Sequence, residues 1–353
     1  MLKNKSDKAA AHRMTTHDTA LQTSKVTRAA ISIQTIAEQA GVSIATVSRV
    51  LNGNTSKVSE ATAKRVMSVV DTFGYRPSRV GSALRSGRSR LVALMVPDPA
   101  NAYHVAIASS VERQLRARNK ILLFCNTQEN ASVQDELLRE MRAQLVSGII
   151  MLGAVESDEL SAQLAAEEPI IFVNRRIEGL PPGRFVGIDN FKAGQVVAEN
   201  FNALGYKKAW LMHGPLTSTA TAARVDGFIS AFGSGEDTRI HNLAMSRMEI
   251  AYSVACEHLT AEDRPDAIFC TTDEIAYGVY KRCRELNLSV PGDIRLFGFD
   301  GNPLNGYLAP WLSTIRVPYE DYGSAVVSML DSYWTKSCYP EEDAIIPFET
   351  IVT

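Results

Sequence analysis

Residues 44–51 combine side chains of the kind that contact nucleic acid. At helical spacing the segment places Ile44, Ala45, Ser48 and Arg49 on one outward face, which is small and neutral apart from the arginine. The mixture of Glu and Lys that an ordinary solvated face carries is missing there. Cations that seek phosphates flank the segment: Lys57, Lys64, Arg65, Arg76 and Arg79. This pattern favours contact with nucleic acid over a three-helix bundle used only for packing.

The arrangement of side chains that could serve catalysis or metal binding does not indicate either function. The sequence has no Walker A, HExxH or GxSxG string, and no GxGxxG follows a strand. Asp273 and Glu274 are adjacent, so on a helix they would point to different faces and make a poor acid–base pair. Five cysteines form no CxxC pair, which predicts reduced thiols rather than disulfides or a zinc site. We therefore expect no enzymatic activity, no cofactor and no metal.

Charge is divided unevenly along the 353 residues. Residues 1–90 hold 15 Lys and Arg against 5 Asp and Glu, whereas residues 91–353 hold 22 against 34. The basic N-terminal part, residues 1–90, predicts a nucleic-acid partner, although a merely solvated basic surface would carry the same charge.

The length of the chain fits two or three domains. The longest apolar stretch, residues 91–97, is far shorter than the about 20 residues that span a bilayer. Because residues 1–30 also lack a secretory signal, we expect a cytoplasmic protein.

The basic part contains three helical segments. Apolar residues at positions i, i+3, i+4 and i+7 predict a helix over 33–40: Ile33, Ile36, Ala37 and Ala40. Gly41 permits the turn that ends this helix, and Ser43 and Ser59 are suitable N-caps for the next two. The expected inward residues of those helices are Val47, Val50, Leu51, Val66, Val69, Val70 and Phe73. A tight turn between the first two helices predicts a helix-turn-helix unit, whose second helix enters the major groove.

From residue 91 onward, short β-rich runs alternate with amphipathic helical segments. The expected strands cover 91–96, 121–126, 148–153, 169–174, 185–188, 208–214, 267–271, 294–299 and 313–317. The helical segments between them include 105–118, 133–145, 193–204 and 251–259. This alternation predicts parallel sheets covered by helices on both faces, the doubly wound α/β architecture. About nine strands are too many for one small lobe, so we expect two similar lobes.

The string AEQAGVSIATVSRVLNG, followed by VSEATAKRVMSVVDTFGYRPS, resembles the LacI family of bacterial transcription regulators. The resemblance continues through PDPANAY, DNFKAG (189–194), ARVDGF (223–228), TTDEIAYG (271–278), GFDGNP and PWLSTIRVP (310–318). Together these motifs cover residues 32 to about 350. The resemblance implies a two-lobed effector domain of the periplasmic-binding-protein type behind the helix-turn-helix domain.

The resemblance also implies roles in DNA binding. Ile44, Ala45 and Arg49 occupy the family's base-reading positions. An Arg side chain can bond the O6 and N7 atoms of guanine, whereas Ile and Ala offer only apolar contact, for instance with a thymine methyl. Positions that anchor phosphates in the family hold Ser43, Thr46, Ser48 and Asn52.

Residues 77–84 match the family's hinge helix, which folds on DNA and inserts a leucine into the minor groove. Leu84 aligns with that leucine, and an apolar wedge kinks the duplex. An isolated helix of eight residues is marginal in water, so it needs DNA and a partner to order it. Gly81 and Ser82 replace the usual Ala-Arg, which predicts a looser hinge. Leu84 could instead be a linker residue that packs on the effector domain.

The matched motifs imply an effector site in the crevice at the carboxyl ends of the strands. The candidate residues are Tyr103, Asn174, Arg175, Arg224, Thr272, Asp273 and Asp300. Arg224 can hold hydroxyls or a carboxylate, and Asp300 can accept from a pair of sugar hydroxyls. Asp273 could simply cap a helix that begins at Glu274, and Tyr103 could be a core residue. Asn replaces the family's Asp at position 174, and Thr replaces its Asn at 272.

We interpret the chain as a ligand-responsive, sequence-specific DNA-binding regulator, a repressor of a sugar or metabolic operon. Its expected partners are a palindromic operator in double-stranded DNA, a sugar or related metabolite, and a second copy of the chain. The expected domains are a disordered arm (1–30), the helix-turn-helix (31–76), a hinge helix and linker (77–90), and the effector-binding and dimerisation domain (91–353). The rival interpretation is a sugar-binding protein or carbohydrate enzyme whose N-terminal helices only pack.

Overall fold

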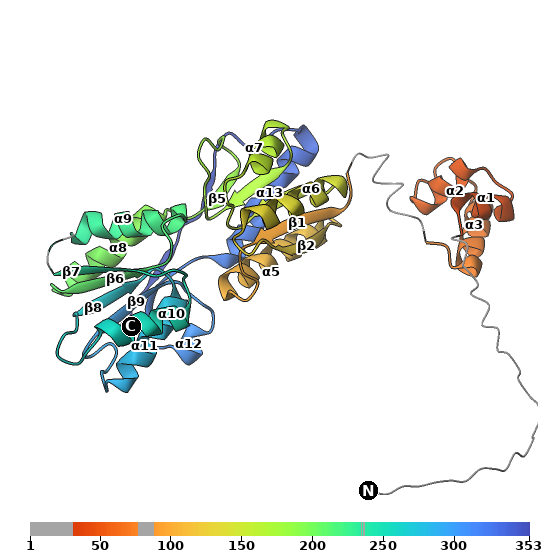
Figure 1. Cartoon of the computed structure of the whole chain (residues 1–353). Coiled ribbons are helices and arrows are strands. Elements are labelled where there is room, and N and C mark those ends of the chain that lie inside the picture. Colours follow the sequence, from red (N-terminus) through yellow and green to blue (C-terminus); the bar gives the residue numbers. More distant parts are fainter. Residues whose placement is uncertain (1–30, 77–87, 234, 236) are drawn as a thin grey trace, which may run out of the picture. The chain divides into compact units, whose positions relative to one another are not determined.

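The computed structural model describes residues 31–76, 88–233, 235 and 237–353 (Figure 1). Internal contacts divide the chain into two units, Met1–Ser78 and Arg79–Thr353. We call these the N-terminal unit and the effector unit. The predictions for the arm at 1–30, for the hinge helix at 77–84 and for Leu84 lie outside the described residues.

The N-terminal unit consists of α1 (Ile33–Ala40), α2 (Ile44–Leu51) and α3 (Glu60–Phe73). A serine caps each helix by accepting from the backbone N–H three residues later, so each helix start is satisfied locally: Ser32 from Thr35, Ser43 from Thr46, and Ser59 from Thr62. Small aliphatic side chains from all three helices fill the core: Ile36, Ala37, Ala40, Val47, Val50, Val66 and Val70. The helix-turn-helix expected from the sequence is present.

Phe73 does not take the buried place that the apolar stripe predicted. It is 38% exposed, because α3 ends there and Gly74 turns the chain with φ at 59°. Tyr75, after that turn, packs against the core instead.

The effector unit contains two six-stranded sheets, one in each lobe. The first lobe has the strand order β11-β5-β4-β3-β1-β2, and the second has β12-β10-β9-β8-β6-β7. Neighbouring strands are parallel, except for the antiparallel pair β10 and β12. The first sheet is built from β1 (Leu91–Val96), β2 (Ile121–Asn126), β3 (Gly148–Met151), β4 (Ile170–Val173), β5 (Phe185–Gly187) and β11 (Ala344–Ile345). The second is built from β6 (Ala209–His213), β7 (Thr238–Asn242), β8 (Ala267–Cys270), β9 (Arg295–Asp300), β10 (Ser313–Arg316) and β12 (Glu349–Ile351).

Helices cover both faces of each sheet (Figure 1). Alternate residues of β1 enter different core clusters: Val92 and Leu94 join one, and Ala93 and Met95 join another. The helices near the first sheet are α5 (Ala102–Ala117), α6 (Ala131–Ala143), α7 (Asp158–Ala165) and α13 (Tyr319–Lys336). Those of the second lobe are α8 (Asn190–Ala203), α9 (Thr219–Phe232), α10 (Met248–His258), α11 (Asp273–Glu285) and α12 (Asn305–Leu308). This is the doubly wound architecture that the sequence predicted.

The chain crosses between the lobes three times. It leaves the first sheet after β5, returns between β10 and α13, and crosses once more between β11 and β12. The nine expected strands are present with slightly different ends, but β7, β11 and β12 were not anticipated. The last two are only two and three residues long, and β7 is an edge strand with mostly exposed residues.

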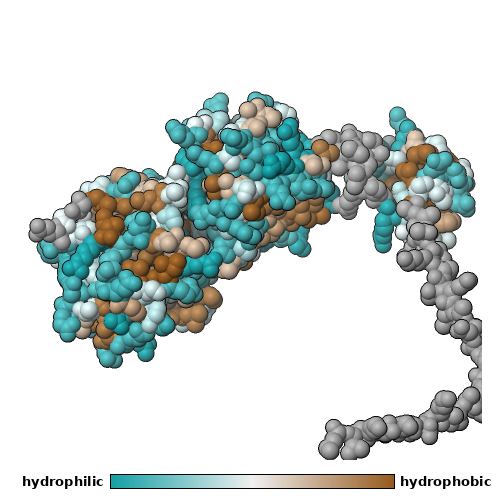
Figure 2. Space-filling view, in the orientation of Figure 1, coloured by the Kyte–Doolittle hydropathy of each residue, from teal (hydrophilic) through white to brown (hydrophobic). Residues whose placement is uncertain are grey.

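The visible surface of each unit is largely hydrophilic, with scattered apolar patches (Figure 2). Within the described ranges, no helix is both long and apolar enough to cross a membrane.

Two glycines bring helices α8 and α9 into backbone contact. A Cβ atom on Gly194 would lie 2.2 Å from the carbonyl oxygen of Arg224, and one on Gly227 would lie 2.0 Å from that of Phe191. Gly278 in α11 is similarly close to the carbonyl of Met248, at 2.2 Å. All three glycines belong to the motifs noted in the sequence, and the first two fix the helix that carries Arg224.

We predict that Gly194→Ala destabilises the effector unit by about 1–3 kcal/mol, because the new methyl group must push apart two packed helix backbones. Urea unfolding followed by tryptophan fluorescence measures this, since all three tryptophans lie in the effector unit. Gly306→Ala is the matched control, because no atom lies within 4 Å of its added Cβ. Equal unfolding midpoints for Gly194→Ala and the control would contradict the assigned backbone contact.

Candidate functional site

The outward face of α2 is open in the N-terminal unit. Ile44 is 47% exposed, Ala45 and Arg49 are exposed, and Val47 and Val50 are buried on the opposite side. Among the described residues, no carboxylate lies within 4 Å of Arg49. The three side chains expected to read bases therefore share one accessible face.

The four residues expected to contact phosphates lie beside that face and are not buried. The hydroxyl of Ser43 accepts from the N–H of Thr46 and lies 2.9 Å from the Thr46 hydroxyl. The Nδ2 group of Asn52 donates to the carbonyl oxygen of Ser48 at 2.8 Å. Ser43, Thr46, Ser48 and Asn52 are thus held in place by local hydrogen bonds at the two ends of α2.

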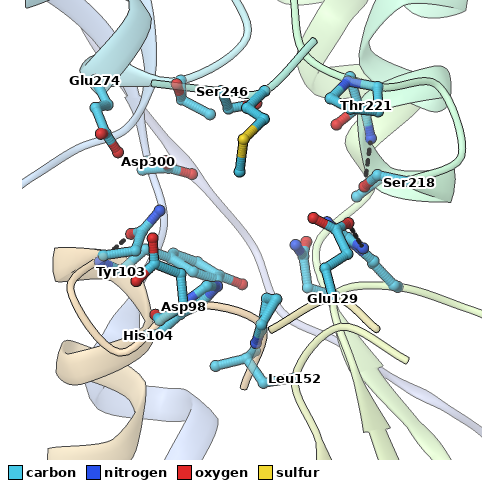
Figure 3. A pocket seen from close by; sticks show the side chains of 18 of the residues that line it. Asp98, Tyr103, His104, Glu129, Leu152, Ser218, Thr221, Ser246, Glu274 and Asp300 are labelled. Atoms are coloured by element: carbon cyan, nitrogen blue, oxygen red, sulfur yellow. Dashed lines mark hydrogen bonds and ion pairs between the residues drawn. The ribbon is translucent and has the colours of Figure 1, made fainter. Parts of the chain in front are cut away.

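A pocket of about 290 Å³ lies between the two lobes of the effector unit (Figure 3). It collects side chains that follow strands β1, β4, β8 and β9, as the rule for parallel sheets requires. The pocket brings together six of the seven expected residues: Tyr103, Asn174, Arg175, Arg224, Thr272 and Asp300. We call it the effector pocket.

Arg224 is buried at the wall of this pocket, with its side chain only 4% exposed. Its Nε donates to Asn190 Oδ1 at 2.8 Å, and its Nη1 donates to the carbonyl oxygen of Thr271 at 2.7 Å. The guanidinium lies 3.5 Å from the centre of the Phe299 ring. These contacts fix the orientation of the guanidinium plane before any ligand arrives.

Asp300 ends β9 with a φ of 103°, a conformation that costs a non-glycine residue about 1–3 kcal/mol. Its carbonyl oxygen accepts from the Tyr319 hydroxyl at 2.6 Å and from the Val317 N–H at 3.0 Å, which holds the strained backbone in place. Its carboxylate is 3.8 Å from Arg224 Nη1, too far for a hydrogen bond. Burial therefore raises the pKa of Asp300 to about 8, although Arg224 opposes the shift.

Asp273 is not the helix cap that the sequence suggested. Helix α11 begins at Asp273, and its N-cap is Thr272, whose hydroxyl accepts from the Ile275 N–H at 3.2 Å. The Asp273 carboxylate is buried and accepts from three groups after β9 and in β10: Asn302 N–H, Asn305 Nδ2 and Thr314 Oγ1. Burial raises its pKa to about 6 despite these hydrogen bonds. It lines a second, adjoining pocket rather than the effector pocket.

Tyr103 serves both of the roles considered for it. Its side chain belongs to the core cluster that runs through both lobes, and it also lines the effector pocket. His104, next to it, places Nδ1 2.6 Å from the carbonyl oxygen of Asp98, and burial lowers the pKa of its imidazole.

Two ion pairs at the pocket were missed in the sequence. Arg175 Nη1 lies 2.6 Å from Glu129, and Arg247 Nη2 lies 2.8 Å from Asp98, which joins the two lobes. Asp98 and Glu129 follow β1 and β2, so their position at strand ends could have indicated them. Arg247 follows β7, a strand that the sequence did not predict. Throughout the described residues, no group of three or more His, Cys, Asp or Glu side chains could hold a metal ion.

Comparisons with known proteins agree with this architecture. A model of the lacI family of bacterial regulatory proteins matches residues 32–78, and one of periplasmic binding protein-like domains matches residues 198–353. The regulator PtxS of Pseudomonas plecoglossicida is 30% identical over 308 residues, covering 86% of this chain and 89% of that protein. Catabolite control protein A of Priestia megaterium is 29% identical over 310 residues, covering 87% of this chain and 93% of that protein.

Solved structures share the fold. The lac repressor dimer bound to operator and the anti-inducer ONPF superposes with a TM-score of 0.80 at 21% identity, over 91% of this chain and 98% of that one. The complex of the regulator CelR with cellobiose gives a TM-score of 0.67 at 22% identity, over the same shares of the two chains.

We predict that the effector unit loses stability as the pH rises from about 5 to 8. The pKa values of Asp273 and Asp300 are raised in the folded state, so folding favours their protonated forms, and that advantage disappears as they ionise. One such group contributes a slope of at most about 1.4 kcal/mol per pH unit. Urea unfolding of Asp300→Asn should show a shallower decline than the unmodified protein.

Asp321→Asn provides the control, because it makes the same chemical change at an exposed residue. Parallel pH profiles for Asp300→Asn and the unmodified protein would show that Asp300 does not titrate in this range.

Proposed function

The chain belongs to the LacI family of bacterial regulatory proteins, a family of ligand-responsive DNA-binding regulators rather than enzymes, and we propose which residues perform each role. We propose that Ile44, Ala45 and Arg49 contact base edges in the major groove, and that Ser43, Thr46, Ser48 and Asn52 contact phosphates. Arg49 is suited to a bidentate contact with guanine, because it is exposed and, within the part of the chain that the structure describes, no carboxylate lies within 4 Å of it. Leu84 is proposed to enter the minor groove between the half-sites.

We propose that the interlobe pocket binds the effector, and the main support is that Arg224 and Asp300 both line it. A fixed guanidinium and a carboxylate 3.8 Å apart at the wall of a polar cavity can respectively donate hydrogen bonds to, and accept them from, a small hydroxylated ligand. Tyr103, Asn174, Arg175 and Thr272 complete the lining. Asp273 does not line this pocket; its carboxylate stabilises the segment after β9 by accepting hydrogen bonds from Asn302 and Asn305.

The effector proposed for this site is a sugar or a related metabolite. Curated relatives include a ribose operon repressor of Bacillus subtilis and a sucrose operon repressor of Streptococcus mutans, and the transcriptional repressor PurR of Vibrio atlanticus is among them too. Solved structures with the same fold hold cellobiose and ribose. These ligands belong to those proteins, and they support a small polar ligand here.

We propose that the chain acts as a homodimer on a palindromic operator. Two recognition helices must meet two half-sites about one helical turn apart, which a single copy cannot do. The lac repressor, which shares the fold, is a dimer on its operator. Effector binding would favour one arrangement of the lobes and thereby change operator affinity, a coupling that is reciprocal between the two ligands.

We predict that Arg49→Ala relaxes base preference at one position of each half-site and costs about 1–3 kcal/mol in operator binding, because a bidentate contact is lost. Selection from a randomised operator library measures the preference. Lys57→Ala should instead weaken binding to all sequences alike and reduce the salt dependence, as expected for a phosphate contact. An unchanged preference in Arg49→Ala would remove the base-reading role.

We predict that Arg224→Ala abolishes the effector response but retains operator binding, because Arg224 lies in the effector unit. A panel of sugars, sugar phosphates and organic acids is tested for its effect on operator binding in gel-shift assays. Arg264→Ala, which breaks an exposed ion pair with Asp293, is the control and should respond normally. A fully responsive Arg224→Ala protein would refute the assignment of the pocket.

A further inference from the structure

A second cavity, of about 320 Å³, adjoins the effector pocket. It lies where helices α5, α10 and α11 begin, and we call it the acidic chamber. Six residues line both cavities: Asp98, Asn101, Tyr103, Arg247, Glu274 and Asp300. The two cavities therefore share these side chains as a common boundary, and Figure 3 shows Glu274, Asp300, Tyr103 and Asp98 gathered on one side of the effector pocket.

Negative charge dominates the acidic chamber. Its lining contains one cation, Arg247, which is paired with Asp98 at 2.8 Å. The other carboxylates are those of Glu249, Asp273, Glu274 and Asp300. Among the described residues, Glu249 and Glu274 have no basic side chain within 4 Å. The three helix N-termini add about half a positive charge each, which leaves the chamber negative.

Helix stability alone does not explain this arrangement. Acidic residues in the first turn, such as Glu249 in α10 and Glu274 in α11, do stabilise helices. Glu249 is itself exposed, but Glu274 is half-buried, and an exposed position would stabilise the helix equally well. Here the carboxylates face a shared cavity together with Asp300, which belongs to β9 and stabilises no helix start.

The hydroxyl of Tyr103 is an independent indication of a ligand. Tyr103 is only 7% exposed, and among the described residues its hydroxyl makes no hydrogen bond of normal geometry, although it lies near the equally buried hydroxyl of Tyr322. The other tyrosine hydroxyls of the chamber are occupied, since Tyr277 donates to Asn305 Oδ1 and Tyr319 donates to the carbonyl oxygen of Asp300, each at 2.6 Å. Buried polar groups rarely remain unpaired, so the Tyr103 hydroxyl is expected to form a hydrogen bond with a polar group of a ligand.

We propose that the effector carries a protonated amino group, which occupies the acidic chamber between Glu274 and Asp300 while the rest of the ligand contacts Arg224. An ammonium has three donors and can satisfy the two carboxylates and the Tyr103 hydroxyl at once. A ligand with a carboxylate or phosphate at this end would meet mostly like charges, because the one cation in the lining, Arg247, is already paired with Asp98. The class is thus a small hydroxylated amine, and this inference rests on the effector pocket proposed above.

The titration of the chamber agrees with a cationic ligand. Burial raises the pKa of Glu274 and brings that of Asp273 to about 6 and that of Asp300 to about 8. A cation beside these groups favours their ionised forms, so binding should release protons near neutral pH.

The test compares three matched compounds at constant ionic strength: glucosamine, glucose and glucuronate. The same comparison on smaller probes uses ethanolamine, ethylene glycol and glycolate. Calorimetry on the full chain should show each ammonium compound binding at least tenfold more tightly than its neutral counterpart, with no detectable binding of the carboxylates. Proton release should appear when the titration is repeated in buffers of different ionisation enthalpy.

Glu274→Gln should weaken binding of the ammonium compounds at least tenfold, and Glu249→Gln should weaken it less. Glu341→Gln, an exposed residue outside both cavities, is the charge-matched control and should bind normally. The proposal is overturned if the ammonium compounds do not bind, if a neutral or anionic member binds equally well, or if Glu274→Gln has no effect.

These outcomes are separable from failure of the proposed function. If cellobiose, ribose or another compound without an amine alters operator binding by the unmodified protein but not by Arg224→Ala, the effector pocket stands and only the amine subsite is lost. If operator binding itself shows no sequence preference, the proposed function fails regardless of the calorimetry.

Discussion

The close backbone contact between α8 and α9 is the constraint on which the effector pocket depends. Because Gly194 and Gly227 carry no side chains, the two helices approach closely enough for Arg224 to reach Asn190 and the Thr271 carbonyl. These two bonds hold the guanidinium against Phe299 and 3.8 Å from Asp300. A wider helix spacing would move Arg224 away from the ends of β8 and β9, where the ligand groups gather.

That placement also determines the electrostatics of the pocket. The hydrogen bonds of Arg224 go to an amide and a carbonyl, so its charge only partly compensates Asp300, and burial keeps the pKa of that carboxyl high. The nearby carboxylates of Asp273 and Glu274 raise the pKa of Asp300 further. The site therefore holds polar groups that are fixed in position but not fully neutralised by one another, which suits recognition of a small polar molecule.

The parts of the structure that the sequence could predict are those determined by residues close together in the chain. Each helix of the N-terminal unit begins with its own serine cap and carries its own apolar stripe, so α1, α2 and α3 follow from short segments. The role of Asp273 depends instead on Asn302, Asn305 and Thr314, which approach it only in the folded chain. Arg247 was missed because β7 is exposed and lacks the apolar run of a buried strand. Motif resemblance indicated six pocket residues, but not the carboxylates that surround them.

The final crossing between the lobes has a consequence for biosynthesis. Strand β11 adds to the first sheet, and β12, only a few residues later, adds to the second. Neither sheet can acquire its last strand until residues 344–351 have left the ribosome, and α13 reaches the first lobe only shortly before. Both lobes of a nascent chain are thus completed almost together, so a chain that has not yet been synthesised as far as residue 351 exposes unfinished sheet edges.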